Sequence, residues 1–361
     1  MAFPPRPEPF RGRAAELGTL ATACRPGSNP RLALVGTGGS GKSTLAAALG
    51  HRVSARYRGG IEWFRVGRWD HRTLLDMLAI RMNVPLGGLR ERDRRLRELR
   101  RALARRGPTF IVLDNHENDR ETARLLTLLD GLPVCWVITV RRCLLSGVSV
   151  FPVVAPLSTA RRSPFPRVAE LTDVLRWNPL ALDVANALVA TGAITAHTLR
   201  AWLVAHGVLR VAPIAHEDDL PELRLLVRWA WPRVGGAGRR LLTALAHLEG
   251  DHVDADALAA LARTGRASRA GLARLVRWHL VQQPLPGRYA LHATIRHAIE
   301  GRTRFDPARA VAYFVRLLER HPDRLDFEQT HLFAAMDHAH TTSDLGLGLR
   351  LETLLERLGL A

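Results

Sequence analysis

The sequence predicts an α/β fold: a parallel sheet with helices on both faces, followed by smaller domains that are mainly helical. Two observations support this prediction. Over residues 1–155, short apolar runs alternate with amphipathic stretches at helical spacing, which is typical of repeated βαβ units. Beyond them, strand-like runs almost disappear while amphipathic stretches continue. A chain of 361 residues is long enough for two or three domains with cores of their own.

The individual elements follow from the apolar pattern. Continuous apolar runs of strand length are expected for strands buried on both faces, and they predict strands at residues 31–35, 60–66, 109–113, 133–139 and 150–154. The amphipathic stretches between them predict helices at residues 42–55, 72–82, 90–106 and 119–130. Ligands of such sheets bind outside the carboxyl ends of the strands, so polar residues that directly follow these strands are candidate site residues.

The helix expected at 90–106 is strongly basic but carries Leu96, Leu99 and Leu103 on one face. It could bind nucleic acid or a membrane surface. More often such a helix covers a sheet with its leucines and leaves its charges in water. We favour the second interpretation.

The formal net charge of +18 raises the same question for the whole chain. An acidic partner such as nucleic acid is one explanation. The other is a GC-rich coding sequence that favours arginine, because all but one of the 52 Lys and Arg residues are arginine and they are scattered. We favour the second.

The sequence lacks the marks of a membrane or secreted protein. It shows no N-terminal signal pattern and no apolar stretch long enough to span a bilayer. Its three cysteines, Cys24, Cys135 and Cys143, have no metal-binding spacing. We therefore expect a cytoplasmic protein without a membrane partner.

The single lysine, Lys42, lies in the most informative segment. Residues 36–43, GTGGSGKS, match G-x-x-x-x-G-K-[ST] at every fixed position, between an expected strand and an expected helix. In such a loop, backbone N–H groups and the helix N-terminus bind phosphates. A compact ammonium reaches the terminal phosphates in a way that a planar guanidinium does not. The segment predicts a P-loop, with Lys42 in a catalytic role.

A bound nucleotide needs Mg²⁺, which takes oxygen ligands. Ser43 offers one oxygen, and Asp114, which ends an apolar run, offers the next. The following strand ends at Thr139 and Arg141, where a γ-phosphate sensor is expected.

After residue 155 we expect amphipathic helices, with Pro179 near the start of one of them. Two short strand-like runs joined by Pro286-Gly287 predict a hairpin, the wing of a winged helix. The helix before it, SRAGLARLVRWHL, carries arginines that either contact DNA phosphates or are solvated. Residues 307–361 predict three further helices.

These motifs, taken in order, resemble the NB-ARC branch of the STAND signal-transduction ATPases over residues 10–301. FRGRAAELGTL is similar to the N-terminal motif of the family, GTGGSGKST to Walker A, and FIVLDNHEN to the Walker B form of bacterial members. VITVRR resembles the sensor strand, WNPLALDVA the GxPLA motif, and LVQQPLPGRYALHATIRHAI the end of the winged helix. The winged helix would then cover a nucleotide rather than bind DNA.

The resemblance implies roles for particular residues. Ser43 and Asp114 would hold Mg²⁺, and Arg141 would sense the γ-phosphate. Pro179 would pack on the adenine, and His292 would reach the β-phosphate of ADP and lock a closed state. The residues lining the adenine side would be Phe10, Arg11, Gly12 and Arg13. The phosphate-binding loop would comprise Gly36, Thr37, Gly38, Gly39, Ser40, Gly41, Lys42, Ser43 and Thr44.

The sequence departs from the family at three points. Asn115 replaces the second Walker B acid, with Glu117 two residues later, so hydrolysis is expected to be slow. Ala293 stands where the family usually has Asp after the histidine, which weakens the expected ADP lock. Family members also carry an effector domain and a long repeat sensor, so the resemblance implies a separate effector or sensor partner, or a longer natural chain.

These observations predict four domains: a P-loop nucleotide-binding domain at 1–155, a helical domain at 156–215, a winged helix at 216–304 and a helical tail at 305–361. The expected function is a switch that binds ADP or ATP with Mg²⁺, opens on exchange to ATP, and then self-associates or contacts a partner. One alternative is a DNA-binding AAA+ ATPase of the origin-recognition type. Another is a nucleotide-binding scaffold without turnover.

Overall fold

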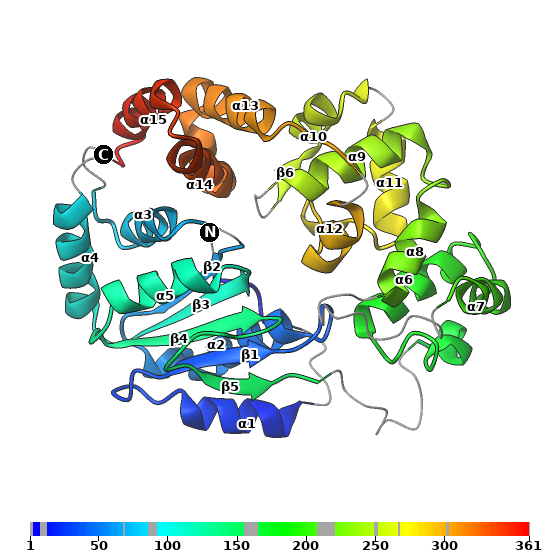
Figure 1. The fold of residues 1–361 in the computed structure, drawn as a ribbon, viewed down its shortest axis with the longest axis horizontal. Coiled ribbons are helices and arrows are strands. Elements are labelled where there is room, and N and C mark those ends of the chain that lie inside the picture. The colour runs from blue at the N-terminus through cyan, green and yellow to red at the C-terminus, as the bar shows by residue number, and fades with distance from the viewer. Residues whose placement is uncertain are drawn as a thin grey trace. The chain divides into compact units, whose positions relative to one another are not determined.

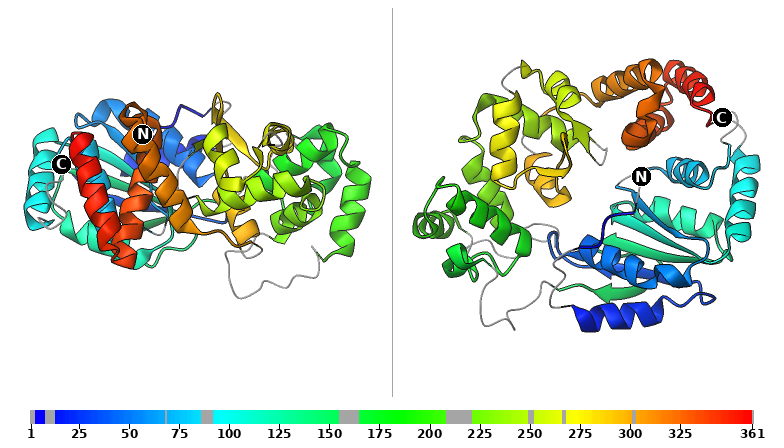
Figure 2. Two further views of the ribbon diagram at one scale, coloured as in Figure 1. Left: turned by 90° about the horizontal axis from the view of Figure 1, so that it is seen from above. Right: turned by 180° about the vertical axis from the view of Figure 1, so that it is seen from behind.

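The computed structural model describes residues 3–7, 13–67, 69–85, 92–154, 165–207, 221–248, 252–265, 268–300 and 303–360. The chain forms two compact units, which are described separately (Figures 1 and 2). The first contains Met1–Val35, Lys42–Pro152 and Ala308–Ala361, and the second contains Gly36–Gly41 and Val153–Pro307. Among the described residues, no helix is both long and apolar enough to cross a bilayer.

The first unit is built on a five-stranded sheet in the order β2-β3-β4-β1-β5. All of its strand pairs are parallel. The central strands are apolar and buried on both faces, which explains their continuous apolar runs. The strands are β1 (Arg31–Val35), β2 (Ile61–Arg65), β3 (Thr109–His116), β4 (Val134–Val140) and β5 (Ser149–Pro152).

Helices cover both faces of this sheet, which confirms the predicted fold class (Figure 1). Helices α1 (Ala14–Ala23) and α2 (Lys42–Val53) lie on one face, and the short turn η1 (Ser54–Arg56) follows α2. On the other lie α3 (His71–Arg81), α4 (Arg92–Arg106) and α5 (Asp119–Leu128).

The basic helix α4 covers the core, as the sequence predicts. Leu99 and Leu103 are fully buried in the core of the first unit, and Leu96 packs against its edge. Most of the arginines of α4 are exposed or partly exposed. The apolar face therefore explains why this helix packs on the core.

The C-terminal helices belong to the first unit. They are α13 (Pro307–Arg320), η4 (Pro322–Arg324), α14 (Leu325–Thr342) and α15 (Leu345–Arg357), in agreement with three predicted helices. In Figures 1 and 2, α14 lies alongside α3. Leu332, Phe333 and Met336 of α14 belong to the same apolar core as the sheet. The ring of Phe333 packs edge-on against that of Trp69, with 6.2 Å between the ring centroids.

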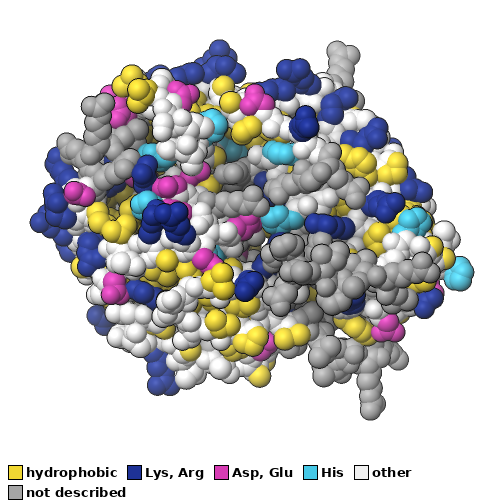
Figure 3. Space-filling view, in the orientation of Figure 1, with side chains coloured by type: hydrophobic (Ala, Val, Ile, Leu, Met, Phe, Trp, Pro, Cys, Tyr) yellow, Lys and Arg dark blue, Asp and Glu magenta, His cyan; other side chains and the backbone are white. Residues whose placement is uncertain are grey.

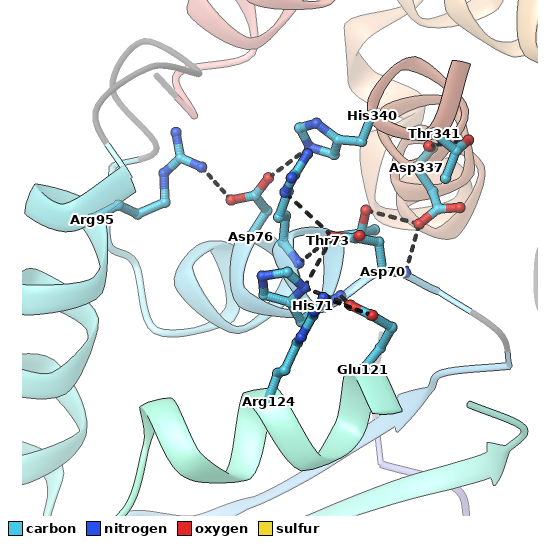
Figure 4. Close-up of polar contacts among 11 residues, drawn as sticks. Asp70, His71, Thr73, Asp76, Arg95, Glu121, Arg124, Asp337, His340 and Thr341 are labelled. Carbon is cyan, nitrogen blue, oxygen red and sulfur yellow. Dashed lines mark hydrogen bonds and ion pairs between the residues drawn. The ribbon is translucent and has the colours of Figure 1, made fainter. Parts of the chain in front are cut away.

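Polar contacts complete the joint between α14 and α3 (Figure 4). The Oδ1 atom of Asp337 accepts hydrogen bonds from the backbone N–H of Asp70 at 2.9 Å and from the hydroxyl of Thr73 at 3.0 Å. Deeper in the joint, the buried carboxylate of Asp76 forms an ion pair with Arg95 and lies 3.5 Å from Nε2 of His340. The tail is therefore held by specific pairing as well as by apolar contact.

The second unit is mainly helical. Its helices are η2 (Pro166–Leu171), α6 (Pro179–Ala190), α7 (Ala196–Ala205), α8 (Pro221–Ala230), α9 (Gly235–His247), α10 (Ala255–Ala262), α11 (Ser268–Arg277) and α12 (Ala293–Glu300). Its small antiparallel sheet, in the order β6-β8-β7, contains β6 (Val253–Asp254), β7 (Gln282–Leu285) and β8 (Arg288–Ala290).

The predicted hairpin is present. Strands β7 and β8 are joined by Pro286-Gly287, and Gly287 has a φ of +72°, a conformation that glycine adopts without strain. The order α9, β6, α10, α11, β7, β8 is that of a winged helix.

The contacts of Asp337 lead to a stability prediction. Asp337→Ala leaves the Asp70 N–H and the Thr73 hydroxyl without their acceptor, so we expect it to lower the free energy of unfolding by about 1–3 kcal/mol. Burial raises the pKa of Asp337, so the charge itself is not favoured there. Asp337→Asn keeps an acceptor oxygen and should stay within about 1 kcal/mol of the parent. Urea unfolding of both variants measures the difference, and equal losses would contradict this account.

Candidate functional site

Three polar side chains of the first unit converge where the strands end. The carboxylate of Asp114, on β3, accepts a hydrogen bond from the hydroxyl of Ser43 at 2.7 Å and another from the hydroxyl of Thr139 at 2.6 Å. Ser43 lies in the first turn of α2 and Thr139 lies on β4. Asp114 is only 7% exposed. Residues separated by 71 and 25 positions in the chain thus form one buried polar cluster.

Strand β3 ends differently from the prediction, which placed its end at residue 113. It continues to His116, with a register shift after Leu113. Asn115 causes the irregularity, because it has a φ of +57°, which asparagine tolerates better than most residues. Its backbone N–H donates to the Thr139 hydroxyl at 2.9 Å, and its side-chain amide donates to the carboxylate of exposed Glu117 at 3.1 Å.

His116 fastens this strand end to α5. Its ring is buried and makes hydrogen bonds with the Asp119 carboxylate at 2.7 Å and the Thr122 hydroxyl at 2.9 Å. Burial lowers the pKa of His116, although Asp119 acts in the opposite direction. The sequence offered no signal for this role, because a histidine after Walker B has no fixed meaning.

The remaining site residues predicted for the first unit are more dispersed. Arg141 directly follows β4 and is partly exposed. Arg13 directly precedes α1, is 7% exposed, and its pKa is lowered by burial. Phe10, Arg11 and Gly12 lie outside the described residues. Lys42 and Thr44 occupy the first turn of α2.

The glycine loop itself, Gly36–Gly41, packs within the second unit. Gly39 has a φ of +72° and Gly41 a φ of +88°, which suit glycine alone without strain. Within the loop, the Ser40 N–H donates to the Thr37 carbonyl at 3.2 Å, and Ser40 is fully buried. A Cβ on Gly36 would lie 2.2 Å from the Val153 carbonyl oxygen. The fixed glycines are therefore required by backbone geometry and by close neighbours.

The residue before the Pro-Leu-Ala motif holds the loop. Asn178 is the N-cap of α6, and its side-chain oxygen accepts from the backbone N–H of Ala181 at 3.0 Å. Its side-chain amide donates to the Gly38 carbonyl at 3.0 Å, and the residue is 4% exposed. Pro179 occupies the first turn of α6, as predicted. Sequence reasoning missed Asn178, although an Asn before a proline at a helix start is a capping signal.

The start of α12 also contacts the loop. A Cβ on Gly38 would lie 2.6 Å from the Thr294 hydroxyl. His292 immediately precedes α12, and its Nδ1 accepts from the Thr294 N–H at 3.2 Å. Because Nδ1 accepts, a neutral ring carries its proton on Nε2. The predicted His292 is thus two residues from a contact with the glycine loop.

The donor set of the strand-end cluster suits Mg²⁺. Ser43 and Asp114 supply a hydroxyl and a carboxylate oxygen that already lie 2.7 Å apart, and hard oxygens are the ligands that Mg²⁺ prefers.

A second group, Asp70, His71 and Glu121, also brings potential metal ligands within 4.8 Å of one another (Figure 4). Protein contacts already occupy them. Asp70 caps α3, and Glu121 accepts from His71 at 2.5 Å and from Arg124 at 3.0 Å. Burial alone would raise the pKa of Glu121, but the hydrogen bonds from His71 outweigh it and the pKa is lowered. We assign this group to the joint between α3 and α5.

Comparison with known proteins identifies the fold. No protein-family model matches the sequence, and no curated protein matches it. Among solved structures, the chain is similar to a STAND protein with a tetratricopeptide repeat sensor from Pyrococcus horikoshii. The two share 16% identity over 99% of this chain and 59% of that one, with a TM-score of 0.55.

Two further structures are similar at lower scores. One is ORC1 of Aeropyrum pernix, in complex with DNA, with 17% identity over 82% of this chain and 94% of that one and a TM-score of 0.37. The other is CDC6P of Pyrobaculum aerophilum, with 15% identity over 84% and 98% and a TM-score of 0.36.

Of these three similarities, the first alone has a TM-score above 0.5, and this chain spans 59% of that protein's length. It extends over nearly the whole of the present chain. The chain therefore has the fold of a STAND-class P-loop ATPase.

Proposed function

We propose that this chain is a nucleotide-dependent switch that binds ADP or ATP with Mg²⁺ in the cytoplasm and hydrolyses ATP slowly. The observation that carries the proposal is the hydrogen-bonded cluster of Ser43, Asp114 and Thr139, which follows a complete P-loop in the chain. If no carboxylate lay beside its serine, a P-loop would bind the Mg²⁺ complex of a nucleotide poorly. Here the two oxygens are already paired.

The phosphates would be bound by backbone N–H groups of residues 38–44 and by the Lys42 ammonium. The left-handed glycines turn successive N–H groups in one direction, and the positive end of α2 adds to the attraction for an anion. Ser43 and Asp114 would hold Mg²⁺, which neutralises phosphate charge when bound. Their mutual hydrogen bond keeps both oxygens in place.

The second unit would supply the closed state. Asn178 and Thr294 contact Gly38 of the loop, so α6 and the start of α12 limit how the loop can move. We assign to His292 a hydrogen bond from Nε2 to the β-phosphate of ADP, since its Nδ1 already accepts from Thr294. Exchange to ATP would disturb this contact and favour an open form, provided that the two nucleotides differ in affinity for the two forms.

Hydrolysis would depend on Asn115 and Glu117. An amide at Asn115 is not a base, and Glu117 is exposed and bonded to it, so the attacking water would be poorly oriented. Arg141, next to β4, would sense the γ-phosphate. Slow turnover is consistent with a switch, in which the nucleotide state must last.

Other parts of the proposal depend on the resemblance. Arg13, with Phe10, Arg11 and Gly12, would line the adenine side, and Pro179 would pack on the base. The four-domain division at residues 155, 215 and 304 is part of the same proposal. In the ATP state, the chain would self-associate or contact a separate effector or sensor protein.

Lys42→Ala tests the phosphate site. It removes the ammonium that bonds the terminal phosphates, so we expect nucleotide affinity to fall at least about 100-fold. Isothermal titration with ADP and ATP gives the measurement. Arg52→Ala, at the exposed other end of α2, is the matched control and should bind like the parent. If Lys42→Ala bound ADP and ATP as tightly as the parent, the P-loop would not be the nucleotide-binding site.

Asp114→Asn tests the magnesium site. We expect the parent to bind ATP more tightly with Mg²⁺ than with EDTA, and the variant to lose most of this difference, because an amide is a weaker ligand than a carboxylate. Binding in EDTA should change little. A variant that keeps the full Mg²⁺ effect would place the metal elsewhere.

His292→Ala tests the closed state. Loss of one hydrogen bond to a charged group predicts ADP release faster by roughly 10-fold, with a smaller change for ATP. Stopped-flow release of a fluorescent ADP analogue measures the rate. His297→Ala, farther along α12, serves as the control, and an unchanged rate in His292→Ala would remove the histidine from the switch.

A further inference from the structure

The winged helix of the second unit contains a helix-turn-helix. Helix α10 ends at Ala262, α11 begins at Ser268, and the connection contains Gly265 with a φ of +51°. The β7–β8 hairpin follows α11. In DNA-binding proteins with a helix-turn-helix, the second helix enters the major groove. Helix α11 occupies that position here.

Helix α11 has two contrasting faces. Ser268, Leu272 and Leu275 are buried against the rest of the unit. The exposed face consists of arginines and alanines only: Arg269, Ala270, Ala273, Arg274 and Arg277. No acidic residue occurs in α11. The small alanines would let the backbone approach a partner closely, while three guanidinium groups surround them.

Two of these arginines form hydrogen bonds that use only some of their N–H donors. Arg274 donates from Nη1 to the Arg233 carbonyl at 3.2 Å, and Arg277 donates from Nε to the Ala273 carbonyl at 3.3 Å. A guanidinium has five N–H donors. The neighbouring hairpin adds the exposed amides of Gln282 and Gln283 and has no acidic residue.

Net charge by itself does not single out this face. Figure 3 shows Lys and Arg side chains spread over the visible surface among acidic and apolar ones. Helix α4 is richer in arginine than α11, but it includes Asp93 and Glu98, and Glu98 forms an ion pair with Arg101 at 2.7 Å. The exposed face of α11 differs because no carboxylate on its own helix compensates its arginines.

We propose that α11 and the β7–β8 hairpin form a binding surface for duplex DNA. Arg269, in the first turn of α11, is placed to reach base edges, and Arg274 and Arg277 are placed to contact phosphates. Within this unit, the glycine loop is contacted by Thr294 of α12 and Asn178 of α6, so the exposed face of α11 takes no part in that contact. This inference goes beyond the proposed nucleotide switch and does not rest on it.

The test is fluorescence anisotropy of the full chain with a labelled random-sequence duplex of about three helical turns, titrated at several salt concentrations. The decisive variant is Arg269→Ala/Arg274→Ala/Arg277→Ala. Its matched control is Arg94→Ala/Arg97→Ala/Arg105→Ala, which removes the same charge from exposed positions of α4.

We expect the α11 variant to lose about tenfold or more in affinity at physiological salt. The slope of log affinity against log salt concentration should fall by the equivalent of about two phosphate contacts. The α4 variant should stay within about twofold of the parent. Triple Arg→Lys substitution on α11 should restore most of the affinity, because lysine also pairs with phosphate. If the triple variant unfolds, Arg269→Ala alone takes its place, with a loss of roughly threefold or more expected.

Three outcomes would overturn the proposal. Equal losses in the α11 and α4 variants would mean that only net charge matters. If the parent did not bind duplex DNA at physiological salt, α11 and the hairpin would not be a DNA-binding surface. Tighter binding of single-stranded RNA than of duplex would assign the surface to another nucleic acid.

Discussion

The polar cluster of the first unit depends on the hydrogen bonds that the carboxylate of Asp114 accepts. A buried carboxylate must be paired or hydrogen-bonded to be tolerated, and this one has two hydroxyl donors, Ser43 and Thr139. Each donor comes from a different element. The carboxylate therefore fixes the start of α2 against the ends of β3 and β4, where a parallel sheet places its ligand-binding edge.

From this point, specific contacts continue to the C-terminal helices. His116 joins the end of β3 to α5, and Glu121 of α5 joins His71 of α3. The backbone N–H of Asp70, the N-cap of α3, donates to the carboxylate of Asp337 of α14. Each step is a short hydrogen bond between residues that are at least half buried. Thus α14 is connected to the strand that would bind magnesium through contiguous packed elements, and its apolar residues share one core with that strand.

Helices α12 and α11 of the second unit differ in what surrounds them. The start of α12 packs on the glycine loop together with Asn178 of α6. Helix α11 instead leaves a face of arginine and alanine exposed. The face that α11 exposes is therefore separate from the contact that Thr294 of α12 makes with the loop.

The sequence alone determined the parallel sheet, the glycine loop, the burial of α4 and the hairpin, because each depends on local periodicity or on a short motif with steric requirements. Its predicted strand bounds lie within two residues of the observed ones except at β3, where Asn115 allowed an irregular extension that apolar periodicity does not reveal. The pairing of Asp114 with Ser43 and Thr139, the hydrogen bond from Asn178 to Gly38, and the packing of α14 on α3 were decided only by the tertiary structure. They join residues far apart in the chain, and no local pattern specifies which distant donor will meet which acceptor.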